Sequence, residues 1–267
     1  MQLPEHDGRS AALIDIAIAA GRSTLEHFRR RDLSVDRKGD DSPVTIADRN
    51  AEQIARRMIA GRFADDSIHG EEFDNTEGSS EYRWVIDPID GTKSFICGVP
   101  LYSTLVAIER GDQVVGGVIF IPALDEIVVA VRGGGAWTRV GDADWTRAEV
   151  STTDDLSTAT FVCSQVDSFA ERGSGQGYRD LEAACRITRS WGDGYGYLLV
   201  ATGRADVMVD PVCNPWDVAA VAPVVEEAGG RFTDWKGNAT VRGGDGIGSN
   251  SRLHDAVRGT LGSMSET

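Results

Sequence analysis

The chain has 267 residues, of which 41% are hydrophobic and 26% are charged, and its formal net charge at pH 7 is −15. This composition excludes a wholly disordered, collagenous or coiled-coil chain, and the length predicts one unit, residues 1–267, with subregions 1–150 and 151–267. The acidity argues against a nucleic-acid partner because phosphate backbones would be repelled. Bound cations could still invert the local field around a small anionic substrate.

The first residues, MQLPEHDGRS, contain neither a basic nor an apolar segment of a secretory signal, and no apolar run approaches the roughly 20 residues of a membrane span. The four cysteines form no C-x-x-C pair and match no zinc-binding spacing. We therefore expect a cytoplasmic protein with reduced thiols and no membrane association.

Residues 1–150 predict two helices followed by a β-rich region. Apolar residues recur at helical spacing over 11–30 and 47–62, and the polar residues 36–43 predict a loop between them. Strands are expected at 67–69, 82–86, 102–108, 114–121 and 127–131. Three glycines at 133–135 are expected to end the β-rich run, and 141–158 to be peripheral.

Residues 160–234 alternate between segments with the period of a strand and segments with the period of a helix. Strands are predicted at 160–164, 186–190, 205–209 and 230–234, and helices at 178–185, 195–202 and 216–228. The glycine-rich residues 243–248 predict a loop, followed by a short helix. Such alternation indicates an α/β (α+β) protein with layered sheets and with helices between and outside them.

The strongest local motif is DPIDGT at residues 87–92, directly after a predicted strand. Pro88 has a restricted φ and Gly91 permits a tight approach, so the turn can direct two carboxylates and the Ile89 carbonyl into one volume. Clusters of oxygen ligands suit Mg²⁺, Mn²⁺ or Ca²⁺. The alternative is an Asp-rich turn that caps a helix.

Other acidic residues also stand at element ends. Glu71 follows a predicted strand, Asp217 opens a predicted helix, and Asp48 enters the second helix. Taken singly, they fit a solvated loop, a partner of the helix dipole and a helix cap. Together with Asp87 and Asp90 they would form a cluster that is costly without cations. Two or three Mg²⁺ ions would make that cluster a site for phosphate ester hydrolysis.

Three segments resemble the inositol monophosphatase superfamily: GEE at 70–72, WVIDPIDGT at 84–92 and NPWDVAAVAPVVEEAGG at 214–230. The resemblance extends over nearly the whole chain. It implies a layered α-β-α-β-α sandwich, a homodimer, and a Mg²⁺-dependent phosphomonoesterase in which Mn²⁺ could substitute.

The resemblance also implies residue roles. The metal ligands would be Glu71, Asp87, the Ile89 carbonyl, Asp90 and Asp217. Thr92 with Asp48 would orient and activate the attacking water, close to Glu71, and the backbone N–H groups of Gly91 and Thr92 would face the phosphate. Lys38 is similar to a loop lysine near the active site of this family, with a solvated loop lysine as the alternative.

Within the superfamily, WGDGYGY at 191–197, PLY at 100–102 and NPWD at 214–217 are similar to the histidinol-phosphate phosphatase branch, although Gly194 stands where that branch often has Cys. This implies L-histidinol phosphate as substrate. Asp193, Asp210 and Asn214 would bind its amine and imidazole. Asp210 would equally suit the hydroxyls of an inositol or another small polyol.

A second class of function is a non-catalytic phosphate-binding protein, but the complete set of acids with Thr92 argues against it. A two-carboxylate glycosidase would not need this many acids.

Overall fold

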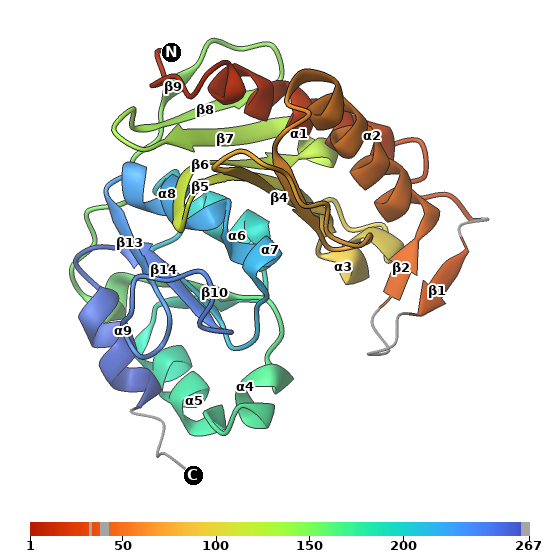
Figure 1. The fold of residues 1–267 in the computed structure, drawn as a ribbon. Helices are drawn as coiled ribbons and strands as arrows, with labels where there is room; N and C mark the ends of the chain where they lie inside the picture. The colour runs from red at the N-terminus through yellow and green to blue at the C-terminus, as the bar shows by residue number, and fades with distance from the viewer. Residues whose placement is uncertain (32–33, 38–42, 263–267) are drawn as a thin grey trace.

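The computed structural model describes residues 1–31, 34–37 and 43–262. Figure 1 shows these residues as successive layers: helices α1 and α2, a large sheet, a central layer of helices, a smaller sheet and an outer layer of helices. Buried apolar clusters fill the spaces between the layers. The layered α-β-α-β-α sandwich predicted from the sequence is confirmed.

The larger sheet contains its strands in chain order, all antiparallel to their neighbours except the first pair. They are β3 (Ser67–Gly70), β4 (Tyr82–Asp90), β5 (Ser103–Arg110), β6 (Gln113–Ile121), β7 (Glu126–Val131), β8 (Ala136–Val140) and β9 (Thr146–Arg147). Helix α1 (Arg9–Thr24) packs on β5 and β6, and α2 (Ile46–Arg62) packs on β4.

The smaller sheet has the strand order β11-β10-β12-β14-β13. Its strands are β10 (Thr160–Cys163), β11 (Ile187–Arg189), β12 (Val207–Asp210), β13 (Gly230–Thr233) and β14 (Gly246–Asn250). Helices α6 (Gly194–Ala201) and α8 (Val221–Glu227) contact both sheets, and α7 (Pro215–Val218) contacts β4 and β5.

The outer helices are α4 (Asp167–Glu171), α5 (Gly175–Ala184) and α9 (His254–Leu261). The remaining elements are short: β1 (Val35–Arg37), β2 (Pro43–Thr45), α3 (Thr92–Ile96), and the 3₁₀ turns Pro122–Leu124 and Leu156–Thr158. In the described ranges, no helix combines the length and apolar character needed to cross a bilayer.

Strand β4 is longer than the sequence predicts, because it continues beyond residue 86 to Asp90 through a break in register opposite β5. Pro88 lies in this bulge, where the ladder does not need its missing N–H. The Pro88 carbonyl instead accepts a hydrogen bond from Thr104 Oγ1 at 2.8 Å. The irregularity therefore sits inside the strand and not after it.

Two glycine-rich segments also differ from their predictions. Gly133 and Gly135 have positive φ and turn the chain into β8, so the sheet continues past residue 135. Residues 243–248 do not form only a loop, because β14 begins at Gly246. A Cβ on Gly248 would lie 2.7 Å from the Tyr197 ring, so glycine here permits close packing of β14 on α6.

Three further boundaries differ. Helix α1 ends at Thr24 and not near residue 30. The helix predicted over 216–228 is divided into α7 and α8, because Pro223 cannot donate an N–H to the preceding turn. The loop predicted over 36–43 includes parts of the antiparallel pair β1–β2.

Candidate active site

Three buried or half-buried carboxylates converge between the end of β4 and the start of α7. Asp87, Asp90 and Asp217 each offer an oxygen within 4.8 Å of the others. Asp87 also lies close enough to Glu71 and Asp217 for their charges to raise its pKa. Two carboxyl groups at this range must share either a proton or a cation. The structure thus brings together four of the acids that the sequence singled out.

The bulge in β4 directs its two aspartates. The Ile89 N–H donates to Asp87 Oδ1 at 3.1 Å. Asp90 Oδ2 accepts hydrogen bonds from Ser103 Oγ and from the Gly194 N–H, both at 2.5 Å. A Cβ on Gly194 would lie 2.3 Å from Ser103 Oγ, so only glycine allows α6 to begin this close to Asp90. Asp90 is therefore held by β5 and α6 together.

Asp217 is oriented by the start of α7. The Asn214 N–H donates to Asp217 Oδ2 at 2.6 Å, and the Asn214 side chain contacts the same oxygen at 3.4 Å. Pro215 occupies the first turn, where a missing N–H costs nothing. Asn214 itself is exposed, so the structure places it beside a predicted metal ligand and at the surface of the site.

The three aspartates of this cluster have raised pKa values. Burial raises the pKa of both Asp87 and Asp90 well above the ordinary value, and neighbouring carboxylates raise them further. Burial also raises the pKa of Asp217. In the described part of the chain, no Lys or Arg makes an ion pair with any of the three. A set of carboxylate oxygens of this kind fits a hard divalent cation.

Thr92 and Asp48 meet beside this cluster. Asp48 is fully buried at the start of α2, and its Oδ2 accepts hydrogen bonds from the Thr45 N–H and Oγ1 at 2.8 and 2.6 Å. Its Oδ1 accepts a long hydrogen bond, 3.4 Å, from Thr92 Oγ1, which also contacts the Ile89 carbonyl at 3.1 Å. Burial raises the pKa of Asp48, and the Thr45 hydrogen bonds oppose that shift.

The predicted substrate-binding aspartates Asp193 and Asp210 lie near the acidic cluster, because Asp193 acts on the pKa of Asp90 and Asp217 on that of Asp210. Asp193 precedes α6 with a positive φ of 55°, and a Cβ on Gly91 would lie 2.6 Å from its Oδ2. Burial raises the pKa of Asp193 to about 6, although the charge of Lys93 opposes the shift. Asp210 ends β12 and accepts a hydrogen bond from Ser164 Oγ, and burial raises its pKa to about 7. Lys38 lies outside the described residues.

Several residues that hold the acids in place were not predicted from the sequence. Ser103 and the Gly194 N–H bind Asp90, Ser164 binds Asp210, and Glu52 binds the backbone after Glu71. Only Gly194 stood out in the sequence, because the histidinol-phosphate phosphatase branch often has Cys at this position. The others are ordinary polar residues whose partners lie 13 or more positions away.

Comparisons with known proteins agree with this geometry. Residues 7–265 match the inositol monophosphatase family. The chain is 44% identical to the histidinol-phosphatase of Chlorobaculum parvum over 88% of each chain. It is 40% identical to the histidinol-phosphatase of Streptomyces coelicolor, over 92% of this chain and 94% of that one.

More distant matches cover slightly more of both chains. The inositol-1-monophosphatase of Rhizobium meliloti is 32% identical over 94% of this chain and 96% of its own. The crystal structure of the extragenic suppressor protein suhB from Bartonella henselae superposes with a TM-score of 0.88 at 27% identity, covering 97% of this chain and all of that one.

The layered fold, with an acidic cluster at the end of β4, is that of a metal-dependent phosphatase. The chain belongs to the inositol monophosphatase family, and it is a phosphomonoesterase.

Proposed function

We propose that the protein hydrolyses L-histidinol phosphate to L-histidinol and phosphate with Mg²⁺ as its metal. The substrate assignment rests on the order of sequence identity. The chain is 44% and 40% identical to two histidinol-phosphatases and 32% identical to an inositol-1-monophosphatase. Asp193 and Asp210 support it, because acids beside the site suit a substrate whose leaving alcohol bears an amine and an imidazole.

The proposed ligands for two or three Mg²⁺ ions, or Mn²⁺ in their place, are Glu71, Asp87, the Ile89 carbonyl, Asp90 and Asp217. A divalent cation there would neutralise the phosphate, stabilise the leaving oxygen and acidify a water molecule. The chain contributes orientation and proton transfer to direct attack of water on phosphorus. We assign to Thr92 Oγ1 the hydrogen bond that orients this water, and to Asp48 the acceptance of the proton through Thr92.

Phosphate recognition is assigned to the backbone N–H groups of Gly91 and Thr92, at the left-handed turn that opens α3. This part of the site would serve any phosphate monoester. Discrimination between substrates is assigned to Asp193, Asp210 and Asn214, around the leaving alcohol. An inositol or other small-polyol phosphate is the second candidate, because a carboxylate such as Asp210 also accepts hydrogen bonds from hydroxyls.

The test is phosphate release from histidinol phosphate, inositol 1-phosphate, a nucleotide 3′,5′-bisphosphate and fructose 1,6-bisphosphate, each with Mg²⁺ and with chelator. We expect the largest kcat/KM for histidinol phosphate, no turnover in chelator, and recovery on adding Mg²⁺. A larger kcat/KM for inositol 1-phosphate would move the substrate assignment to the second candidate. Full turnover in chelator would overturn the proposed dependence on a metal ion.

Three interpretations from the sequence stay predictions. They are a homodimer, a cytoplasmic location, and a single unit over residues 1–267 with subregions 1–150 and 151–267. Size-exclusion chromatography with light scattering tests the first directly.

A further inference from the structure

Glu52 is a fully buried carboxylate on α2, one turn after Asp48. Its Oε2 accepts a hydrogen bond from the Glu72 N–H at 2.8 Å. On the other side, the Glu71 N–H donates to the Ile86 carbonyl of β4 at 3.2 Å. The backbone that carries Glu71 is therefore tied to α2 and to β4 at consecutive residues.

Arg56, one further turn along α2, completes this attachment. Its Nε donates to Glu52 Oε1 at 2.7 Å, and its terminal nitrogens donate to Thr76 Oγ1 at 3.1 Å and the Phe73 carbonyl at 3.2 Å. Gly70 lies directly against Glu52, and a Cβ there would lie 2.0 Å from Oε1. One face of α2 thus binds the segment after β3 at several points.

We propose that Glu52 is a positioning residue that sets the place of Glu71 and thereby the affinity of the site for its divalent cation. The inference rests on the proposed metal site. A buried carboxylate is costly to desolvate, and an apolar side chain of this size could fill the space without that cost. What the carboxylate adds is two acceptors, one for Arg56 and one for the Glu72 N–H. Loss of such outer contacts typically weakens metal affinity by about 10- to 100-fold.

The test measures Mn²⁺ binding to the metal-free full chain by electron paramagnetic resonance, without substrate. Glu52→Leu keeps the bulk and removes both acceptors, and we expect its Mn²⁺ affinity to fall by about tenfold or more. Glu52→Gln keeps an oxygen for the Glu72 N–H, and we expect it to restore the affinity to within about threefold of wild type. Gly70→Ala displaces the same contact from the other side and should weaken binding as Glu52→Leu does.

Arg9→Met is the matched control, because Arg9 also forms a buried ion pair, with Asp66, but it packs on Tyr82 and Phe63, and Asp66 binds Ser80 at the far end of the segment between β3 and β4 that carries Glu71. It should lower the melting temperature and leave Mn²⁺ affinity unchanged. The proposal is overturned if folded Glu52→Leu binds Mn²⁺ as wild type does, or if Arg9→Met weakens binding equally.

If Glu52→Leu does not fold, Gly70→Ala decides: weakened binding supports the proposal and wild-type affinity overturns it. If the wild-type chain takes up no Mn²⁺, the proposed metal site fails together with this inference. If the wild type binds and the Glu52 variants bind equally well, only the positioning role fails.

Discussion

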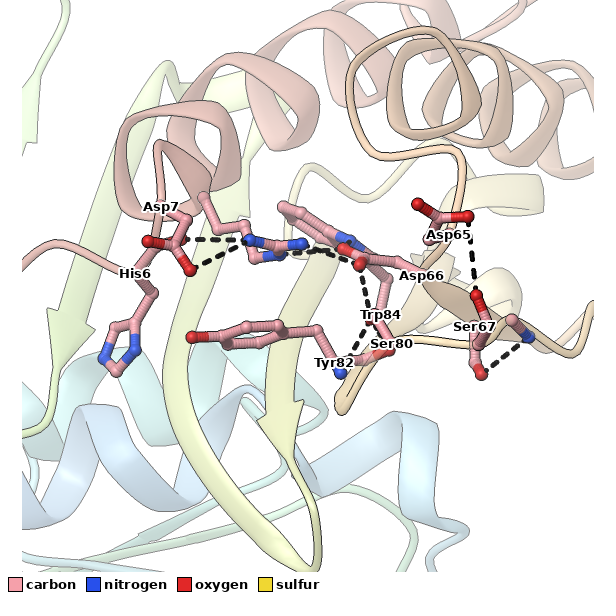
Figure 2. Close-up of polar contacts among 11 residues, drawn as sticks. His6, Asp7, Asp65, Asp66, Ser67, Ser80, Tyr82 and Trp84 are labelled. Carbon is pink, nitrogen blue, oxygen red and sulfur yellow. Dashed lines mark hydrogen bonds and ion pairs between the residues drawn. The ribbon is translucent and has the colours of Figure 1, made fainter.

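Two groups of buried acids in this molecule are treated in opposite ways. Asp66, at the start of β3, is surrounded by donors, and Figure 2 shows Trp84 and Ser80 directed at its carboxylate. Arg9 adds two hydrogen bonds, at 2.8 and 2.7 Å, and its guanidinium lies 3.9 Å from the centre of the Tyr82 ring. Burial alone would raise the pKa of Asp66, but these donors outweigh it and the pKa is lowered.

The acids between β4 and α7 also accept hydrogen bonds, but within the described residues they form no ion pair with Lys or Arg. Asp87, Asp90 and Asp217 face one another, and burial with mutual repulsion raises their pKa values. Among the described residues, Asp66 is neutralised by Arg9, whereas Asp87, Asp90 and Asp217 mainly face one another, a charge balance that fits a cation site. The comparison separates a structural ion pair from a binding site on charge balance alone.

The largest expected effect is the loss of hydrolysis in Asp90→Asn. The amide keeps the volume of Asp90 but removes one ligand charge, so we expect kcat to fall by about 10³-fold or more, equivalent to about 4 kcal/mol. The measurement is steady-state phosphate release with circular dichroism to check folding. Asp66→Asn, the same change in the other group, should keep the wild-type kcat. A wild-type rate in Asp90→Asn would place Asp90 outside the site.

The next effect is on stability and belongs to the Arg9–Asp66 pair. Asp66→Asn leaves a buried guanidinium without its counter-charge, so we expect the free energy of unfolding to fall by about 3 kcal/mol. Urea denaturation at pH 7 measures it. Asp90→Asn should cost the metal-free protein far less, because it relieves repulsion. Equal losses in the two variants would contradict the distinction between the groups.

A smaller effect is expected for the hydroxyl groups that contact the two kinds of acid. Thr92→Val removes the donor to Asp48, and we expect kcat to fall by about 10²-fold with little change in KM. Ser80→Ala removes the 2.6 Å donor to Asp66 and should leave kcat unchanged. A change confined to KM in Thr92→Val would reassign Thr92 to substrate binding.

The smallest expected effect is the change in stability at low pH. Because the folded-state pKa of Asp66 is lowered, the unfolded chain binds its proton at higher pH than the folded one. Its stabilising contribution is therefore complete above the ordinary value of 3.8 and is lost as pH falls through the folded-state pKa. The stability difference between wild type and Asp66→Asn should shrink on acidification below pH 3.8. A stability difference that stays constant down to pH 2 would refute the lowered pKa of Asp66.

Some parts of the site could be predicted from the sequence and others could not. Residues 87–92 are close in the sequence, so the restricted φ at Pro88 and the freedom at Gly91 already predict that Asp87 and Asp90 converge. The sequence did not reveal that β4 continues through a bulge to Asp90, because this depends on the pairing with Ser103 of β5. Nor could it assign Glu52, whose charge on an amphipathic helix is typical of a solvated face.

The sequence by itself determined most of the helices and strands and the local chemistry: helical and strand periods, the acidic motif at 87–92, and a resemblance that brought Glu71 and Asp217 to it. Only the tertiary structure decided how the acids are held and which of the described acids pair with an arginine. The Gly194 N–H reaches Asp90 across 104 positions, and Arg9 reaches Asp66 across 57. Helix and strand periods are set by neighbours in the chain, whereas charge balance in a buried site is set by neighbours in space.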